Sequence, residues 1–462
     1  MFRSVTKDSV ADMIDASLLA KLDRAVPRYT SYPTAPHFSP SVAQAAQAAW
    51  LAAIPQDSPL SLYLHVPFCD QLCFFCGCNT AVVRRDALKY DYAEQLIHEI
   101  RTVGAHLGTR RPVAHIHWGG GTPTALPADA LVAVAAAIRE SFLIRDSAEI
   151  AVEIDPRTLD DSRIAALAEI GVNRASLGVQ DFDPAVQRAI GRIQDFAMTR
   201  RCVDSLRAIG IASINLDILY GLPFQTVESA RRTAEMTLAL APDRIAAFGY
   251  AHVPWMKKHQ NLIPEAALPD APERFAQRAA IDETFTAAGY HAIALDHYAR
   301  ADDSLALAAA AGTVGRNFQG YTTDPAEILI GLGASAISTY PQGYLQNITA
   351  TADYAKAIRR DGLAATRGIE IDATDRLRRD VINALMCGFS ADLQAISAAH
   401  GVAPTLFASE VARLDEHIAD GLATWDGKTV RVTTVGQPFV RVIAAVFDTY
   451  LNPAGQRHSR AV

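Results

Sequence analysis

The chain has 462 residues, enough for one large domain and a smaller one. Half of the residues are hydrophobic and a fifth are charged, which is the composition of an ordinary globular protein with material for a buried core. The net charge of −7 gives no reason to expect a nucleic-acid partner, and no apolar run is long enough to span a bilayer.

The cysteine content and the first residues favour a reduced compartment. Six cysteines, four of them within ten residues, do not resemble the disulfide framework of a secreted protein. The N-terminal residues lack an apolar core followed by a cleavage site, so no signal peptide is expected. We therefore expect a cytoplasmic protein that has no membrane partner.

In chain order, the first predicted part is residues 1–59. Its proline- and tyrosine-rich stretch at 27–34 (PRYTSYPT) suits extended structure better than a helix. From residue 60, short β-rich runs alternate with longer helical segments. The predicted strands are Ser61–Pro67, Ala114–Trp118, Ile150–Ile154, Arg174–Val179, Ser213–Tyr220 and Ile245–Ala251. The predicted helices are Tyr90–Leu107, Pro127–Glu140, Asp160–Glu169, Met198–Ile209, Val227–Leu240 and Pro272–Ala288.

Six strand–helix units in series indicate a parallel α/β sheet with crossover helices. The strands are nearly continuous apolar runs, as expected where both faces of a sheet are covered. One further strand, His291–Leu295, is predicted after the sixth helix. The α/β domain is expected to span residues 60–365.

The last part, residues 366–462, is predicted to be a small helical domain with a hairpin. The expected elements are helices at Arg376–Met386, Asp392–Ala399 and Pro404–Ile418, a hairpin at Ala423–Thr434 and a last helix near Phe439–Tyr450. Because this part has no basic excess, we interpret it as a lid or a structural domain.

The most specific motif follows the first predicted strand. Cys69, Cys73 and Cys76 have the spacing C-x3-C-x2-C, so three thiolates can hold a cluster of four irons and four sulfurs and leave one iron open. This spacing is the signature of radical S-adenosylmethionine (SAM) enzymes. The alternatives are a disulfide pair or a zinc site, which would need four ligands in two separate pairs. Cys78 would saturate the open iron, so we expect that it is not a ligand.

Other polar residues lie at or shortly after the ends of later strands. The glycines at 119–121 allow a ligand to approach the backbone closely, and Thr122 follows them. Loops at the carboxyl ends of parallel strands carry the chemistry in barrels and open sheets. A carboxylate suits hydroxyl or amino groups, and arginine suits a carboxylate, although each residue taken singly could be a surface helix cap. The residues in question are Glu153, Gln180, Arg192 and Asp217.

Taken together, these features resemble the oxygen-independent coproporphyrinogen III oxidases (coproporphyrinogen dehydrogenases) of haem biosynthesis. The resemblance covers nearly the whole chain. Its most specific marks are the 27–34 stretch, YLHVPFC at 63–69, CGCN at 76–79, DHYAR at 296–300 and RNFQGYTT at 316–323. Tyr298 stands where the family commonly has phenylalanine, which does not touch the cluster chemistry.

The resemblance implies a partial, three-quarter TIM-like (β/α)6 barrel of the radical SAM type with a small C-terminal domain, and an N-terminal segment that helps to position the substrate. It implies one [4Fe-4S] cluster on Cys69, Cys73 and Cys76. A first SAM would chelate the open iron, surrounded by Tyr63, Gly120, Glu153 and Ile337. A second SAM would lie beside it, in contact with Phe75, Gly121, Thr122, Gln180, Arg192, Asp217 and Ala251.

The function implied is the oxidative decarboxylation of two propionates of coproporphyrinogen III to vinyl groups, which gives protoporphyrinogen IX, by a 5′-deoxyadenosyl radical. No catalytic side chain is identified. Basic residues should hold the substrate carboxylates, and Arg28 and Arg316 are the candidates. The resemblance also implies a monomer that takes electrons from a donor such as flavodoxin or ferredoxin. The alternatives are a radical SAM-like haem chaperone, whose relatives lack the 27–34 stretch and the CGCN arrangement, and an enzyme that opens or methylates haem.

Overall fold

The structure is a computed structural model that describes residues 14–42 and 44–451. Its centre is a 12-stranded sheet, and the six predicted strands lie side by side within it, in chain order and parallel. They are β1 (Leu60–Val66), β4 (Pro112–Gly120), β5 (Leu143–Ile154), β6 (Arg174–Gln180), β7 (Ser213–Tyr220) and β8 (Arg244–Gly249). The predicted partial barrel is therefore confirmed.

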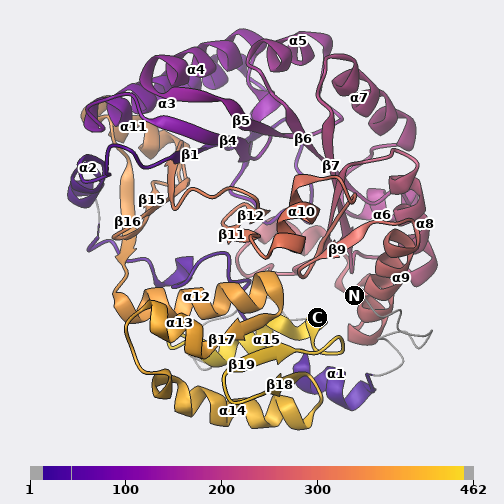
Figure 1. Ribbon diagram of the computed structural model, residues 1–462. Coiled ribbons are helices and arrows are strands. Elements are labelled where there is room, and N and C mark those ends of the chain that lie inside the picture. The colour runs from indigo at the N-terminus through magenta and orange to yellow at the C-terminus, as the bar shows by residue number, and fades with distance from the viewer. Residues whose placement is uncertain (1–13, 43, 452–462) are drawn as a thin grey trace.

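The predicted helices are also present, and they lie on the outer side of the curved sheet (Figure 1). They are α3 (Asp86–His106), α4 (Ala128–Ser141), α5 (Asp161–Glu169), α7 (Phe196–Ala208), α8 (Val227–Leu238) and α9 (Ala271–Ala287). A short helix that the sequence did not indicate, α6 (Pro184–Ala189), precedes α7. The buried apolar residues between the helices and the sheet form one continuous core, which fixes the strand ends that carry the site.

The sheet extends beyond the predicted strands at both edges. Next to β1 lies β13 (Ile328–Leu332), which is parallel to it, and then the antiparallel strands β14 (Ile337–Tyr340), β15 (Gly343–Asn347) and β16 (Ala365–Glu370). At the other edge, β10 (His297–Ala299) pairs antiparallel with β8 and with β9 (His291–Ile293), the strand predicted at 291–295. These added strands are three to six residues long, too short for alternation to mark them clearly.

The C-terminal module is helical with a small antiparallel sheet, as predicted. Its elements are α12 (Ala373–Gly388), β17 (Ser390–Asp392), α13 (Leu393–Ala399), α14 (Ala408–Ala419), β18 (Ala423–Trp425), β19 (Thr429–Val432) and α15 (Val440–Ala444). The last predicted helix is shorter than expected. Turns of 3-10 helix flank α15, and the chain becomes extended at Asp448.

The start of the described chain packs against this module. Helix α1 (Ala16–Leu22) lies beside α14, where Lys21 forms ion pairs with Glu416 and Asp420. Leu19, Leu22 and the tyrosines of the 27–34 stretch join the apolar core of the module. A further helix, α2 (Gln44–Ala52), packs on the barrel. The three-part division at residues 59 and 365 stays a prediction. No helix in the described ranges is both long and apolar enough to cross a membrane.

Candidate functional site

The cysteine loop leaves the carboxyl end of β1 and is closed by a short strand pair. Cys69 ends β2 (Phe68–Cys69), which pairs in parallel with β3 (Ala81–Val82). Cys73 and Cys76 lie in the turn between them, where the Cys76 amide donates to the carbonyl of Cys73. Among the described residues, no three His, Cys, Asp or Glu side chains are grouped so that they could share one metal ion.

Each of the three cysteine sulfurs accepts a hydrogen bond from the protein. The donors are Thr80 Oγ1, 3.2 Å from Cys69 Sγ, Arg157 Nη2, 3.2 Å from Cys73 Sγ, and the amide of Cys78, 3.4 Å from Cys76 Sγ. N–H and O–H donors of this kind stabilise thiolates and metal-bound sulfur. The donor set therefore fits cysteines that bind an iron–sulfur cluster.

Cys76 and Cys78 have opposite protonation tendencies. The hydrogen bond from Cys78 lowers the pKa of Cys76, and the nearby Lys257 and His259 add to the effect. The same contact and the charge of Cys76 raise the pKa of Cys78 well above its usual value. The pair therefore favours the thiolate at Cys76 over the thiolate at Cys78, which suits one ligand and one non-ligand.

Two arginines link Cys73 to Asp155. Arg157 donates from Nη2 to Asp155 Oδ2 at 2.6 Å as well as to the sulfur. Arg192 donates to Asp155 Oδ1 at 3.2 Å and to the carbonyl of Gly178 at 2.6 Å, and its Nη1 lies 3.5 Å from Cys73 Sγ. Burial alone would raise the pKa of Asp155, but Arg192 and Arg157 more than offset it and hold the pKa below its usual value. The sequence indicated Arg192 and missed Arg157.

Tyr63, Gly120 and Glu153 come together on the neighbouring strands β1, β4 and β5. The Gly120 amide donates to Glu153 Oε2 at 3.1 Å, and His117 Nε2 lies 3.1 Å from Glu153 Oε1. The Tyr63 ring stacks on His117 with 5.9 Å between the centroids. A Cβ on Gly119 would lie 2.8 Å from Glu153 Oε1 and 2.9 Å from Tyr63 Cε2. Only glycine allows this close approach.

The remaining predicted SAM contacts fall beside these groups. Thr122 Oγ1 lies 3.5 Å from Cys69 Sγ, and the Gly121 amide donates to the carbonyl of Val66. Gln180, at the end of β6, has a positive φ of 71°. Its side-chain nitrogen and the Arg192 guanidinium both lie against Gly178.

Asp217 lies on β7, where it accepts hydrogen bonds from Ser176 at 2.9 Å and from Asn215 at 2.7 Å. Burial raises the pKa of Asp217 to about 6, and the charge of Glu153 adds to the effect. Asp217 and Glu153 line the same polar hollow inside the barrel. The carboxyl groups predicted for the two SAM sites therefore face a shared space.

The other predicted SAM contacts, Phe75, Ala251 and Ile337, are each located by a neighbouring residue that they contact. Gln260 Nε2 lies 2.8 Å from the carbonyl oxygen of Phe75 and 3.2 Å from that of Ala251. A Cβ on Gly331 would lie 2.6 Å from the carbonyl oxygen of Ile337, and Gly331 pairs in register with Tyr63. Phe75 and Ala251 are thus brought together, and Ile337 lies on β14, separated from the Tyr63 strand by β13.

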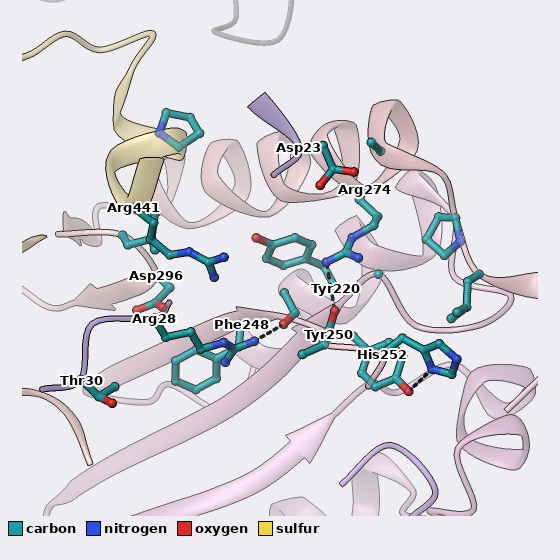
Figure 2. A pocket seen from close by; sticks show the side chains of 18 of the residues that line it. Asp23, Arg28, Thr30, Tyr220, Phe248, Tyr250, His252, Arg274, Asp296 and Arg441 are labelled. Atoms are coloured by element: carbon teal, nitrogen blue, oxygen red, sulfur yellow. Dashed lines mark hydrogen bonds between the residues drawn. The ribbon is translucent and has the colours of Figure 1, made fainter. Parts of the chain in front are cut away.

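A cavity of about 690 Å³ opens beside Ala251, and the close view in Figure 2 shows its side chains. Arg28 and Arg316, the candidates for the substrate carboxylates, both line it. Aromatic side chains form part of its wall, namely Tyr220 on β7, Phe248 on β8 and Tyr250 directly after β8. Sequence reasoning missed Arg441, which reaches the same cavity from α15.

Two further residues beside the cysteine loop were also missed. Lys257 Nζ donates to the carbonyl of Cys78 at 2.8 Å, and His259 Nε2 lies 2.7 Å from the carbonyl oxygen of Cys76. Both follow β8, and a place after a barrel strand was the signal that could have marked them.

A family model, similar proteins and a solved structure agree on what this chain is similar to. Residues 63–237 match the radical SAM superfamily. The chain is 51% identical over 440 residues to an oxygen-independent coproporphyrinogen III oxidase of Bradyrhizobium diazoefficiens, covering 95% of this chain and 98% of that one. It is 46% identical over 444 residues to one of Paracoccus denitrificans, covering 96% and 98%. Its fold is similar to a solved Escherichia coli coproporphyrinogen III oxidase, described as a radical SAM enzyme, with a TM-score of 0.88, 38% identity and coverage of 93% and 100%.

Proposed function

The chain belongs to the oxygen-independent coproporphyrinogen III oxidases of the radical SAM superfamily, and from that premise we propose which of its residues carry the reaction. It is an oxidoreductase of haem biosynthesis that oxidatively decarboxylates coproporphyrinogen III. The observation that carries the residue assignments is the cysteine loop at the carboxyl end of β1, in which every one of three thiol sulfurs has a hydrogen-bond donor.

The family implies a [4Fe-4S] cluster and SAM. We assign Cys69, Cys73 and Cys76 as the cluster ligands, because their sulfurs meet the donors described above while the pKa of Cys78 is raised. When bound, the cluster and SAM supply the hydrogen-abstracting radical. The work of the protein is to bind, to orient and to exclude competing reactions.

Two groups of side chains support two SAM molecules per chain. Tyr63, Gly120 and Glu153 form one group on β1, β4 and β5, with Ile337 on β14 beyond β13. The second group lies on and after β6 and β7, with Arg192 and Gln180 against Gly178 and Asp217 across the hollow. In both groups a carboxylate suits hydroxyl or amino groups of the ligand, and Arg192 suits a carboxylate.

The cavity beside Ala251 is the proposed substrate site. Coproporphyrinogen III is apolar at its rings and anionic at its propionates, and the cavity offers both aromatic walls and guanidinium groups. Arg28 and Arg316 are assigned to the propionate carboxylates. Tyr220, on β7, and Phe248, on β8, offer apolar surface to the pyrrole rings.

The rest of the proposal concerns partners and organisation. We expect two propionates to become vinyl groups, with electrons supplied by a donor such as flavodoxin or ferredoxin. We expect a cytoplasmic monomer without nucleic-acid or membrane partners, built from segment 1–59, the barrel at 60–365 and the C-terminal domain at 366–462. The acidic net charge of −7 supports the absence of nucleic acid.

Anaerobic reconstitution with iron and sulfide tests the function directly. The loaded protein is mixed with SAM, a strong reductant and coproporphyrinogen III, and 5′-deoxyadenosine and protoporphyrinogen IX are measured. Both products are expected. Formation of 5′-deoxyadenosine without protoporphyrinogen IX would contradict the oxidase assignment and leave the radical chemistry standing, whereas tight haem binding with neither product would favour the chaperone.

A further inference from the structure

We propose that Arg441 of the C-terminal module binds a propionate carboxylate of the substrate together with Arg28, so that this module forms one wall of the substrate site. The inference deepens the proposed function and rests on it. It adds a substrate-binding residue that lies 413 positions along the chain from Arg28 and belongs to a different part of the fold.

The geometry places both guanidinium groups at one end of the cavity. Arg441 projects from α15, is 7% exposed and reaches into the cavity, as Figure 2 shows. Its Nη2 donates to the carbonyl of Val26 at 3.3 Å. Arg28 enters from the N-terminal segment and donates from Nη2 to the carbonyl of Gly249 at 3.1 Å. Both guanidinium groups are thus held by backbone carbonyls at the wall of the same cavity.

The charges at this end of the cavity favour an anion. Burial lowers the pKa of Arg441 to about 9, and the like charges of Arg28 and Arg316 add to the effect. Arg28 remains accessible to water, but protein surrounds the hollow in which it lies, and burial lowers its pKa too. Asp296 is the carboxylate whose charge acts on both, and it already accepts a hydrogen bond of 2.7 Å from His297 Nδ1.

The other charged residues of the cavity wall lie elsewhere in it. Asp23 lies beside Arg274 in Figure 2, on the side of the cavity away from Arg28. Glu265 and Asp270 also line the cavity. Arg28, Arg316 and Asp296 line the same cavity, and the charges of all three act on Arg441. Clustered cations in a partly desolvated site are costly unless an anion joins them.

A propionate is the anion that this site would meet. Arginine binds a carboxylate through two parallel hydrogen bonds, which fixes orientation as well as affinity. The cavity extends from the arginines to Ala251, a proposed SAM contact. A substrate held by one carboxylate at Arg441 and Arg28 would therefore present the rest of its ring system toward the radical source.

The test measures binding of coproporphyrin III, the fluorescent oxidised form of the substrate, to the reconstituted holoenzyme. Arg441→Gln is expected to weaken binding about tenfold to a hundredfold, the range for losing a hydrogen bond to a charged group. Arg431→Gln is the matched control, because Arg431 is an exposed arginine of the same module that pairs with Asp426. Its affinity should equal that of the unaltered protein. Cleavage of SAM without substrate should be the same in Arg431→Gln and in the unaltered protein.

Binding of the methyl ester of coproporphyrin III distinguishes loss of the Arg441 charge from a change in the shape of the cavity. It should bind Arg441→Gln and the unaltered protein equally, since its masked carboxylates cannot use the arginine. If the acid binds Arg441→Gln as well as it binds the unaltered protein, or if acid and ester weaken by the same factor, the proposal is overturned. The second result would assign Arg441 to holding the Val26 segment.

Two further results keep the proposal separate from its premise. If Arg441→Gln fails to fold, Arg441→Lys decides, because it keeps the charge and loses the planar fork. Weaker binding of the acid with unchanged binding of the ester supports the proposal, and unchanged binding of both overturns it. If the unaltered holoenzyme binds coproporphyrin III but forms no protoporphyrinogen IX, the oxidase assignment fails while the binding series still tests Arg441.

Discussion

The guanidinium of Arg157 donates a hydrogen bond of 3.2 Å from Nη2 to Sγ of Cys73 and simultaneously binds the carboxylate of Asp155. The Arg157 side chain is 5% exposed, so its charge acts on the sulfur with little screening. Asp155 also holds Arg192, and one buried carboxylate thereby positions both cations against the cysteine loop.

Replacing Arg157 should lower the reduction potential of the cluster. Hydrogen bonds and positive charge at a ligand sulfur favour the reduced, more negative state. Arg157→Gln is expected to shift the potential down by about 60 mV, which for one electron corresponds to a contribution of about 1.4 kcal/mol. A redox titration followed by electron paramagnetic resonance measures it. Arg145→Gln, an exposed arginine on the same strand β5, is the control and should leave the potential unchanged.

The glycine at position 121 should not tolerate a side chain. A Cβ there would lie 2.5 Å from Thr80 Oγ1 and 2.6 Å from the carbonyl oxygen of Phe68. We expect Gly121→Ala to lower the free energy of unfolding by about 1–3 kcal/mol, the usual range for overpacking. Denaturant unfolding measures the change. Gly388→Ala, which has open space around its Cβ and lies at the end of α12, should be neutral or slightly stabilising. Equal effects of the two changes would refute the prediction.

Serine substitution should reduce the bound iron at a ligand cysteine and leave it unchanged at Cys78. Cys73→Ser is expected to lose most of the bound iron after reconstitution, because its sulfur is a proposed ligand with two arginine donors. Cys78→Ser should keep iron and sulfide near four each per chain, since a serine hydroxyl can still donate to the Cys76 sulfur. Iron and sulfide analysis decides between them. An iron content that falls equally in both proteins would mean that Cys78 is a ligand.

A buried carboxyl group should make stability depend on pH. Glu99 accepts hydrogen bonds from the Gly333 amide, Asn347 and Tyr354, yet burial raises its pKa to about 7. The folded state therefore binds this proton more tightly than the unfolded state, whose pKa is near 4.5. The resulting stability is present in full below about pH 4.5 and is lost as the pH rises toward 7, a change of about 3 kcal/mol.

Unfolding curves across this pH range, for the unaltered protein and for Glu99→Gln, isolate the effect of Glu99. Asp181 and Asp217, whose pKa values burial raises to about 7 and about 6, give slopes of the same sign in both proteins. As the pH rises, the free energy of unfolding of the unaltered protein should therefore fall relative to that of Glu99→Gln. A difference independent of pH would show that Glu99 keeps an ordinary pKa.

Local signals in the sequence were sufficient for the barrel and its cysteine loop. The six parallel strands contain apolar residues that are buried in the core, and the spacing of Cys69, Cys73 and Cys76 lies within eight residues. Both signals are local, because a strand and the cysteine motif each span only a few neighbouring residues, so they can be read without knowing distant contacts. The strands β13 to β16 were missed because strands of four to six residues depend on their neighbours for pairing rather than on alternation.

By itself, then, the sequence determined the repeating strand–helix fold, the thiol triad and the family chemistry that they indicate. Tertiary structure alone decided which residues meet. It turned Arg157 toward a cysteine 84 positions away, set the Cys78 amide as a donor to the Cys76 sulfur, and brought Arg28 and Arg441 into one cavity. The physical reason is that charges and hydrogen bonds act over a few ångströms in space, whereas sequence patterns report only on neighbours along the chain.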